Sequence, residues 1–175
     1  MTNLYLDTEF DGHGGALISL ALAAENGRHW YAIHPDTWRR ETFNPWVAEH
    51  VMPDAVLRAM PRTASFFGET EAEFRASLKE YLLARSGCTI WADWPDDFAH
   101  LMRLMSGPSY AESFMIPCTM QLIITPDGEP KPQIPHNALS DAIALMEWHQ
   151  STDPLATKAG AMRLIGDAET VVGTE

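Results

Sequence analysis

The sequence predicts a single mixed α/β domain, in which a three-stranded antiparallel sheet is followed by alternating helices and strands. The first 33 residues hold three apolar runs separated by glycine-containing turns. After a proline-rich stretch, amphipathic segments alternate with short apolar runs, as in an α/β sheet that includes parallel strands. A chain of 175 residues suits one domain. We expect its core over residues 3–150 and a C-terminal helical tail over residues 151–175.

The N-terminal strands are predicted from apolar runs and turn residues. Residues 3–10 are the first predicted strand, and the strongly apolar residues 16–24 are the second. Residues 11–15 contain three glycines and form the turn between them. An Asn-Gly dipeptide then favours a tight hairpin into a third strand over residues 28–33. Together these strands make an antiparallel meander.

The helices are predicted from capping residues and apolar periodicity. Two short helices, over residues 45–50 and 54–60, lie in the irregular stretch 34–68. Thr70 is the N-cap of a helix that runs to Arg85, with its apolar residues on one stripe. The later predicted elements are a buried strand over 88–92, a helix over 95–105, a strand within 112–119, a short helix over 121–124, a long helix from about 138 to 150 and a short helix over 154–164. This order matches the ribonuclease H-like architecture.

Net charge constrains how the protein could hold a nucleic acid. The chain has 24 acidic and 12 basic residues, a formal net charge of −12. Coating a long nucleic acid by counterion release needs a basic surface, so the charge argues against that mode. Bound cations dominate the field around them, however, so an enzyme that grips a short end of a polyanion through metal ions is not excluded.

The compartment is inferred from apolar runs and cysteines. The sequence has no run of about 18 apolar residues, so we expect no membrane span and no membrane partner. Its first residues lack the pattern of a secretory signal. Cys88 and Cys118 belong to no CxxC pair, which argues against zinc-finger or thioredoxin chemistry. We therefore expect a cytoplasmic protein with buried, reduced thiols.

Two acidic residues in the first predicted strand are the strongest functional signal. Asp7 and Glu9 are two residues apart, and side chains at that spacing point to the same side of a strand. Two carboxylates in one patch cost free energy unless a positive charge lies between them. Hard cations such as Mg²⁺ and Mn²⁺ prefer oxygen ligands, so the pair indicates a divalent-metal site. The alternative is an edge strand with a solvated acidic face.

Three further residues could join this pair. Asp97 follows the strand over residues 88–92, at the kind of strand end where α/β sheets commonly bind ligands. Asp141 lies in the last long helix, and His136 precedes it near the helix start. Taken singly, Asp97 could complement a helix dipole, Asp141 could lie on a solvated face and His136 could be a loop residue. Their joint occurrence with the first-strand pair favours a shared site.

These motifs resemble those of the DEDD superfamily of 3′–5′ exonucleases, in the DEDDh branch that includes ribonuclease T, oligoribonuclease and the proofreading exonuclease subunit. The tripeptide Asp7-Thr8-Glu9 matches the first motif. Asp97 matches the second, and His136 with Asp141 matches the third. Within the branch, the chain is most similar to the compact stand-alone exoribonuclease subgroup of mycobacterial type.

The second motif departs from the family pattern. The family often has an asparagine four residues before the metal-binding aspartate, and here Asp93 holds that place. Phe98 and Leu101 continue the helix pattern after Asp97, which favours Asp97 as the ligand. Asp93 and Asp96 stay as alternatives.

The resemblance implies a two-metal exonuclease that binds two divalent cations, Mg²⁺ or Mn²⁺, and releases nucleoside 5′-monophosphates from the 3′ end of single-stranded RNA. It implies that Asp7 bridges both ions. Glu9 and Asp141 are expected to hold the ion on the nucleophile side, and Asp97 to hold the other. His136 is expected to be the general base for the attacking water.

Contacts with the substrate must come from other residues. Phe10 and Trp94 adjoin the first and second motifs and could stack on bases, although a core role explains Phe10 equally well. The resemblance implies that the backbone at Thr8 senses the 3′-terminal sugar. Candidate phosphate contacts, for which surface solubility is the alternative, are Arg39, Arg40, Arg58, Arg62 and Lys131.

Other functions stay open from the sequence. A 3′–5′ DNA exonuclease would use the same residues, because no residue visibly reads the 2′-hydroxyl of RNA. An aspartyl-nucleophile phosphatase also begins with acids at a strand end, but it uses DxD rather than DxE, and a meander does not suit its sheet. The remaining alternative is an inactive nucleic-acid-binding module. A homodimer is considered by analogy with relatives.

Overall fold

The computed structural model describes residues 2–53, 64–66, 69–126 and 129–152. The strands are β1 (Asn3–Phe10), β2 (Leu17–Ala24), β3 (Trp30–Ile33), β4 (Ala64–Phe66), β5 (Cys88–Ala92) and β6 (Cys118–Leu122). The helices are α1 (Pro45–His50), α3 (Glu71–Leu83), α4 (Pro95–Ser106) and α5 (Ala138–Thr152), with two 3-10 helices, η1 (Pro35–Arg39) and η2 (Tyr110–Glu112).

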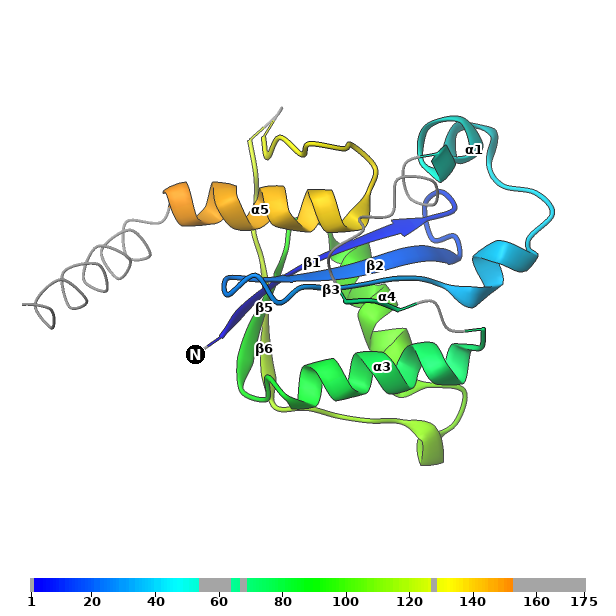
Figure 1. The fold of residues 1–175 in the computed structure, drawn as a ribbon, viewed down its shortest axis with the longest axis horizontal. Coiled ribbons are helices and arrows are strands. Elements are labelled where there is room, and N and C mark those ends of the chain that lie inside the picture. The colour runs from blue at the N-terminus through cyan, green and yellow to red at the C-terminus, as the bar shows by residue number, and fades with distance from the viewer. Residues whose placement is uncertain (1, 54–63, 67–68, 127–128, 153–175) are drawn as a thin grey trace, which may run out of the picture.

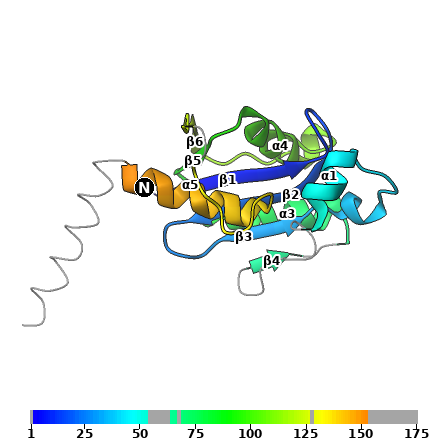
Figure 2. The same cartoon turned by 90° about the horizontal axis from the view of Figure 1, so that it is seen from above.

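The strands form one six-stranded mixed sheet in the order β4-β3-β2-β1-β5-β6. β1, β2 and β3 pair antiparallel, as the predicted meander requires. β5 and β6 add to the β1 edge in parallel, and β4 adds in parallel beyond β3. Figure 2 shows β4 and β6 at opposite edges. This arrangement confirms the α/β, ribonuclease H-like fold that the sequence predicts.

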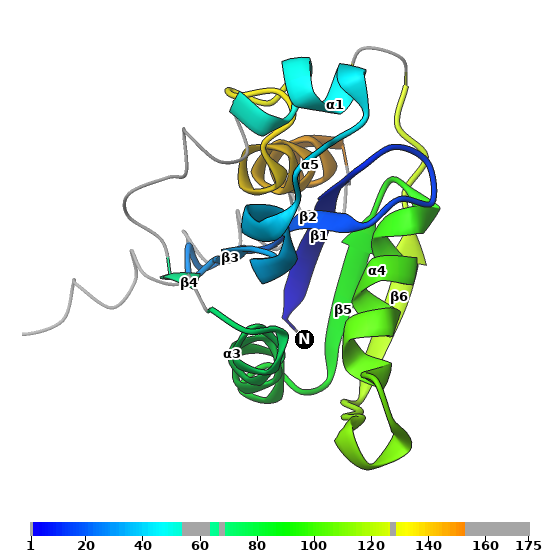
Figure 3. The same cartoon turned by 90° about the vertical axis from the view of Figure 1, so that its right-hand side faces the viewer.

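Both faces of the sheet are covered, so the side chains of β1 alternate between two cores. Leu4 and Leu6 pack into the core that α3 and α4 share with the sheet. Tyr5 packs into the core formed with α5. Figures 1 and 3 show α5 on one side of the sheet and α3 and α4 on the other. The later residues of β1 continue to alternate between the α5 side and the α3 and α4 side of the sheet.

The helix starts follow the predicted capping chemistry. Thr70 caps α3 in a capping box, because its hydroxyl accepts the Glu73 N–H and the Glu73 carboxylate accepts the Thr70 N–H. α3 ends at Leu83, two residues before the predicted Arg85. α1 has the predicted bounds, and Pro95 occupies the first turn of α4.

The prediction around the last strand is wrong in part. Instead of a strand within 112–119 and a helix over 121–124, residues 110–112 form η2, and β6 covers Cys118–Leu122. Gln121 and Leu122 therefore lie in a strand, paired with Trp91 and Ala92 of β5. A short apolar run carries no period that separates helix from strand, so pairing with the β5 edge decides its conformation.

Three sequence predictions fall wholly or largely outside the described residues: the helix over 54–60, the helix over 154–164 and the tail beyond residue 152. Cys88 is buried and Cys118 is half-buried; both are free thiols at paired positions of β5 and β6. Burial, and then proximity to Cys118, raises the pKa of the Cys88 thiol. Within the described ranges, no helix is long and apolar enough to cross a membrane.

Candidate active site

The C-terminal end of β1 lies between the first turns of α4 and α5. β5 runs parallel to β1 and leads directly into α4. The start of α4 and the C-terminal end of β1 therefore lie at the same end of the strands (Figure 1). α5 packs on β1 and β2 from the opposite face, with Asp141 in its first turn. Strand ends of this kind are the usual ligand sites of α/β sheets.

Asp7, Glu9 and Asp141 form the first carboxylate group. Tyr5 packs against α5, so Asp7 and Glu9, two and four residues further along, fall on the α5 side of β1. Each of the three residues offers an oxygen within 4.8 Å of the other two. Contact between the Glu9 and Asp141 carboxyl groups raises the pKa of Glu9 and lowers that of Asp141, while burial raises both.

Asp7, Asp93 and Asp97 form the second carboxylate group, again with oxygens within 4.8 Å of one another. Asp97 lies in the first turn of α4, and Asp93 lies between the end of β5 and α4. Asp7 is common to both groups. The site therefore has two overlapping sets of three carboxylates that meet at one residue of β1.

Thr8 fixes the position of Asp97. One Asp97 oxygen, Oδ1, accepts hydrogen bonds from the Thr8 N–H at 3.1 Å and the Thr8 hydroxyl at 2.6 Å. β1 pairs with β5 over Asn3–Tyr5, so Thr8 lies beyond that ladder and its N–H is free to donate to a side chain. The other oxygen, Oδ2, is buried and has no hydrogen-bond partner among the described residues.

Burial raises the pKa of all five carboxyl groups, and repulsion by neighbouring acids adds to this in four of them. Burial holds the pKa of Asp7 well above its usual value, and the nearby Asp97 and Asp141 charges add to this. The pKa of Glu9 is raised to about 9, first by burial and then by Asp141. Burial also raises the pKa of Asp97 and of Asp141, each to about 7. The pKa of Asp93 is raised by the same cause.

These carboxylates have no compensating cation within the described part of the chain. None of the ion pairs formed there involves any of the five. Asp97 is buried and the other four are half-buried. Carboxylates that are withdrawn from water without an opposite charge nearby either stay protonated or bind a cation. A set of carboxylate oxygens with one buried, unpartnered member fits a hard divalent cation such as Mg²⁺ or Mn²⁺.

His136 reaches the same place from the loop before α5. Its backbone φ is 60°, in the left-handed region that non-glycine residues seldom adopt. Its half-buried ring meets Trp46 edge-on, with ring centroids 5.1 Å apart. Backbone strain persists only where surrounding contacts hold it, and it is frequent at functional sites. The Trp46 contact is one such restraint on the imidazole.

A single pocket of about 680 Å³ collects all eight residues that the sequence analysis assigns to catalysis, metal binding or substrate contact. It is lined by Asp7, Thr8, Glu9, Phe10, Trp94, Asp97, His136 and Asp141, together with Trp46, Pro132 and Pro135. Apolar, aromatic and acidic side chains thus line one pocket. Such a pocket can hold a nucleobase against its rings, and a phosphate beside its acids only if cations neutralise those acids.

Trp46 is a site residue that the sequence analysis missed. It is 51% exposed in the first turn of α1, stacked on His50 and edge-on to His136. The only sequence signal is a large aromatic residue at a capped helix start, where Asn44 accepts the Trp46 N–H. Nothing in the sequence places α1 beside the loop that carries His136, because that contact is made only in the folded chain.

The structure separates the two alternatives for the second motif. Asp93 joins Asp97 and Asp7 in the second carboxylate group. Asp96 belongs to neither group, and its carboxylate instead lies 3.2 Å from His13 in the loop between β1 and β2.

The three candidate phosphate contacts that the structure describes do not line the pocket. Arg39 donates to the Glu69 carbonyl at 2.7 Å, Arg40 pairs with Asp11 at 2.8 Å, and Lys131 pairs with Glu129 at 2.7 Å. Arg58 and Arg62 lie outside the described residues.

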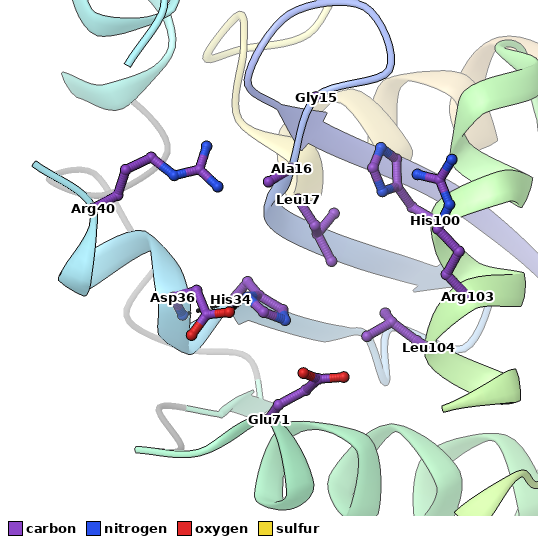
Figure 4. A pocket seen from close by; sticks show the side chains of 10 residues that line it. All are labelled: Gly15, Ala16, Leu17, His34, Asp36, Arg40, Glu71, His100, Arg103 and Leu104. Atoms are coloured by element: carbon purple, nitrogen blue, oxygen red, sulfur yellow. Dashed lines mark hydrogen bonds and ion pairs between the residues drawn. The ribbon is translucent and has the colours of Figure 1, made fainter. Parts of the chain in front are cut away.

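A second cavity, of about 210 Å³, lies on the α3 and α4 side of the sheet. Here His34, Asp36 and Glu71 also bring possible ligand atoms within 4.8 Å of one another. Figure 4 shows Arg40 and Arg103 on opposite sides of this cavity. His34 already accepts the Asp36 N–H at 3.3 Å through Nδ1. Acidic and basic groups are thus mixed in this cavity.

The sheet order defines a ribonuclease H-like protein, and the largest cluster of acidic side chains among its described residues lines a pocket at the end of β1. No protein-family model matches the chain. Two proteins of Mycobacterium tuberculosis, one from strain CDC 1551 and one from strain H37Rv, are each named 3′–5′ exoribonuclease and are 31% identical to it over 150 residues. The match covers 79% of this chain and 85% of each relative. The chain therefore belongs to this family of 3′–5′ exonucleases.

Proposed function

We propose that the protein is a metal-dependent 3′–5′ exoribonuclease. It hydrolyses phosphodiester bonds from the 3′ end of single-stranded RNA and releases nucleoside 5′-monophosphates. The observation that carries the proposal is the position of Asp7, which belongs to two carboxylate groups at once. Two cations held side by side by a shared carboxylate are the arrangement used for in-line phosphoryl displacement.

Each carboxylate has a defined part in this proposal. Asp7 bridges the two sites, Glu9 and Asp141 complete the first, and Asp97 contributes to the second. Two Mg²⁺ or Mn²⁺ ions bound there would supply activation of the attacking water and neutralisation of the leaving oxygen. Thr8 holds Asp97 by one oxygen and leaves the other, buried Oδ2 for a ligand.

His136 is the general base. An imidazole can accept and release a proton near neutral pH, and a positioned base contributes about 10²–10⁴-fold to rate. The Trp46 ring limits the positions that the imidazole can take, which keeps it in the pocket that the carboxylates line. Trp46 is thus a positioning residue for His136 in this proposal.

Aromatic side chains hold the substrate bases. Phe10, Trp46 and Trp94 line the pocket, and both tryptophans are about half exposed. Stacking on such rings is worth about 1–3 kcal/mol per base and reads no sequence. The Thr8 N–H is engaged with Asp97, so we assign Thr8 to orienting that carboxylate rather than to contact with the terminal sugar.

RNA is preferred over DNA as the substrate because the curated relatives are named exoribonucleases. We further propose that the enzyme acts in the cytoplasm, in keeping with its free thiols. A homodimer through the β6 edge is also proposed, because Met115, Leu122 and Ile124 are exposed apolar residues on or beside that edge strand. Light scattering of the protein, with Leu122→Lys as the disrupting variant, tests the dimer.

Trimming of a 5′-labelled single-stranded RNA in Mn²⁺ tests the activity. We expect a ladder of shortened products, no cleavage in EDTA, and no cleavage of RNA that ends in a 3′-phosphate. The same oligonucleotide as DNA should be cut more slowly. Release of inorganic phosphate from small esters, or a single internal cut, would contradict the proposal.

A further inference from the structure

Asp93 is the one carboxylate of the two groups that the proposed function does not yet use. It directly follows β5 and precedes Trp94, the N-cap residue of α4. An acidic residue here could simply cap the helix, but Trp94 has extended backbone angles and no side chain caps this helix start. No ion pair formed by the described residues involves Asp93. Helix capping and ion pairing therefore do not explain its position.

The Asp93 carboxylate is instead close to acids from other elements. It lies with Asp7 of β1 and Asp97 of α4, and the oxygens of the three are within 4.8 Å of one another. Asp93 is half-buried, so water only partly screens its charge from the other two. Three like charges at this separation are unfavourable unless a cation lies among them.

An independent observation at the same place points to a ligand. Asp97 is 1% exposed, and its Oδ2 has no hydrogen-bond partner among the described residues, although its Oδ1 accepts two hydrogen bonds from Thr8. A buried acceptor is rarely left without a partner. A cation shared by Asp97 and Asp93 would satisfy this oxygen and offset both charges.

We propose that Asp93 is a direct ligand of the second divalent cation, together with Asp97 and the bridging Asp7. The inference rests on the proposed function, because that function supplies the second cation. Asp93 and Asp97 then act together, rather than as alternative ligands. The second site has three anionic carboxylates, as the first site has in Asp7, Glu9 and Asp141.

The added carboxylate raises the affinity of the second site. Affinity for a hard cation rises with the charge of its ligands, and an asparagine at position 93 would offer an uncharged oxygen. Outer-shell partners alone change metal affinity by about 10–100-fold, so the loss of a charged ligand should cost at least about tenfold. The enzyme is thus expected to fill its second site at lower Mn²⁺ than an Asp93→Asn variant.

Calorimetric titration of Mn²⁺ into the metal-free protein tests this inference without measuring activity. We expect two ions per wild-type chain, and in Asp93→Asn one unchanged site and one weakened about tenfold or more. Asp96→Asn is the matched control, because Asp96 lies in the first turn of α4 but outside both carboxylate groups. It should bind both ions as the wild type does.

Thermal unfolding of the same proteins separates a lost ligand from a lost fold. Asp93→Asn should unfold at the wild-type temperature or higher in EDTA, and should gain less from added Mn²⁺. An Asp93→Asn protein that binds two ions with wild-type affinity would overturn the inference and leave the proposed function intact. So would equal weakening in Asp93→Asn and Asp96→Asn, which would indicate a long-range charge effect. A wild-type protein that binds fewer than two ions would overturn both proposals.

Discussion

The molecule contains two regions where possible metal ligands gather at the same spacing, and they differ in how their charges are compensated. At the end of β1, five carboxylates form two groups with oxygens within 4.8 Å. In the second cavity, His34, Asp36 and Glu71 meet the same distance criterion. By spacing alone, both regions are candidate cation sites.

Burial and neighbouring charges distinguish them. The Asp36 side chain is 58% exposed and lies 3.5 Å from Arg39, and Glu71 is exposed as well. Arg40 and Arg103 line the same cavity (Figure 4). At the end of β1, by contrast, burial raises the pKa of every carboxyl group, and none is paired with a basic residue of the described chain. Acids indicate a cation site when they are buried without compensation, not merely when they are close together.

Asp7→Asn should have the largest effect, because Asp7 belongs to both carboxylate groups. We expect RNA trimming to fall by roughly 10³-fold or more, beyond the loss of a single electrostatic contact. In EDTA the variant should be as stable as the wild type or more stable, since one buried charge is removed. Turnover on labelled RNA and thermal unfolding in EDTA measure the two effects. Near-wild-type turnover would show that the site is assigned wrongly.

His136→Ala should lower turnover by about 10²–10⁴-fold, as expected for loss of a general base. Binding of Mn²⁺ should be unchanged, because His136 belongs to neither carboxylate group. Single-turnover rates between pH 6 and 9 and a Mn²⁺ titration measure both. His50→Ala is the control, because His50 also contacts Trp46 but does not line the pocket. A rate and pH profile like those of the wild type would exclude His136 as the base.

The stability of the metal-free protein should fall as pH rises. Asp97 and Asp141 have pKa values near 7 and Glu9 near 9 in the folded protein, against about 4 when unfolded. Between those values the folded state holds more protons than the unfolded chain. The stabilisation that comes from protonation of these carboxyl groups is therefore fully present below about pH 4. It is lost as the pH rises past about 7 and then past about 9.

Urea unfolding in EDTA at pH 5, 7 and 9 measures the loss. In saturating Mn²⁺ the dependence should weaken or reverse, because cations bind the deprotonated carboxylates. Stability in EDTA that stays constant or rises across this range would mean that the carboxylates are compensated in the free protein. The two regions would then not differ in whether their acidic charges are compensated.

Thr8→Val should have a moderate effect. The isosteric change removes the hydroxyl that donates to the buried Asp97 oxygen at 2.6 Å, and it leaves the strand intact. Loss of a buried hydrogen bond of this kind costs about 1–3 kcal/mol of unfolding free energy. Urea unfolding at pH 8 measures the cost, with Thr119→Val at an exposed position of β6 as the control. Equal stabilities would mean that Asp97 is held by other contacts.

Glu71→Gln should have the smallest effect and tests the second region directly. Its carboxylate is exposed and lies in a cavity lined by basic residues, so its removal should change neither Mn²⁺ stoichiometry nor RNA trimming. Calorimetry and the trimming assay measure both. Loss of a bound ion in this variant would show that exposed, partly compensated ligands can hold a cation in this fold.

Local sequence predicted much of the secondary structure that carries the site residues. The period of β1 places Asp7 and Glu9 on one side of a strand, and Pro95 and Thr70 mark helix starts as predicted. The motifs, taken together, were enough to name eight of the residues that line the pocket. Trp46, Pro132 and Pro135, which also line it, were missed. Whether they perform the assigned roles is a matter for the experiments above.

Other features could not be read from the chain. Gln121 and Leu122 join β6 because β5 offers them a pairing edge. Asp93 joins the second carboxylate group and Asp96 faces His13 because of the direction in which the chain leaves β5 before α4 begins. Local propensity does not distinguish two aspartates so close in sequence, so the sequence could not show which of them joins the group. Trp46 meets His136 across 90 positions of sequence.

The amino-acid sequence by itself thus determined the alternation, the caps and the order of the motifs, because these depend on residues a few positions apart. The tertiary structure alone decided which acids share a cation site, which remain compensated by arginine, and which aromatic ring restrains the histidine. These depend on distances between elements and on exclusion of water, and both arise only when the sheet and its helices pack together.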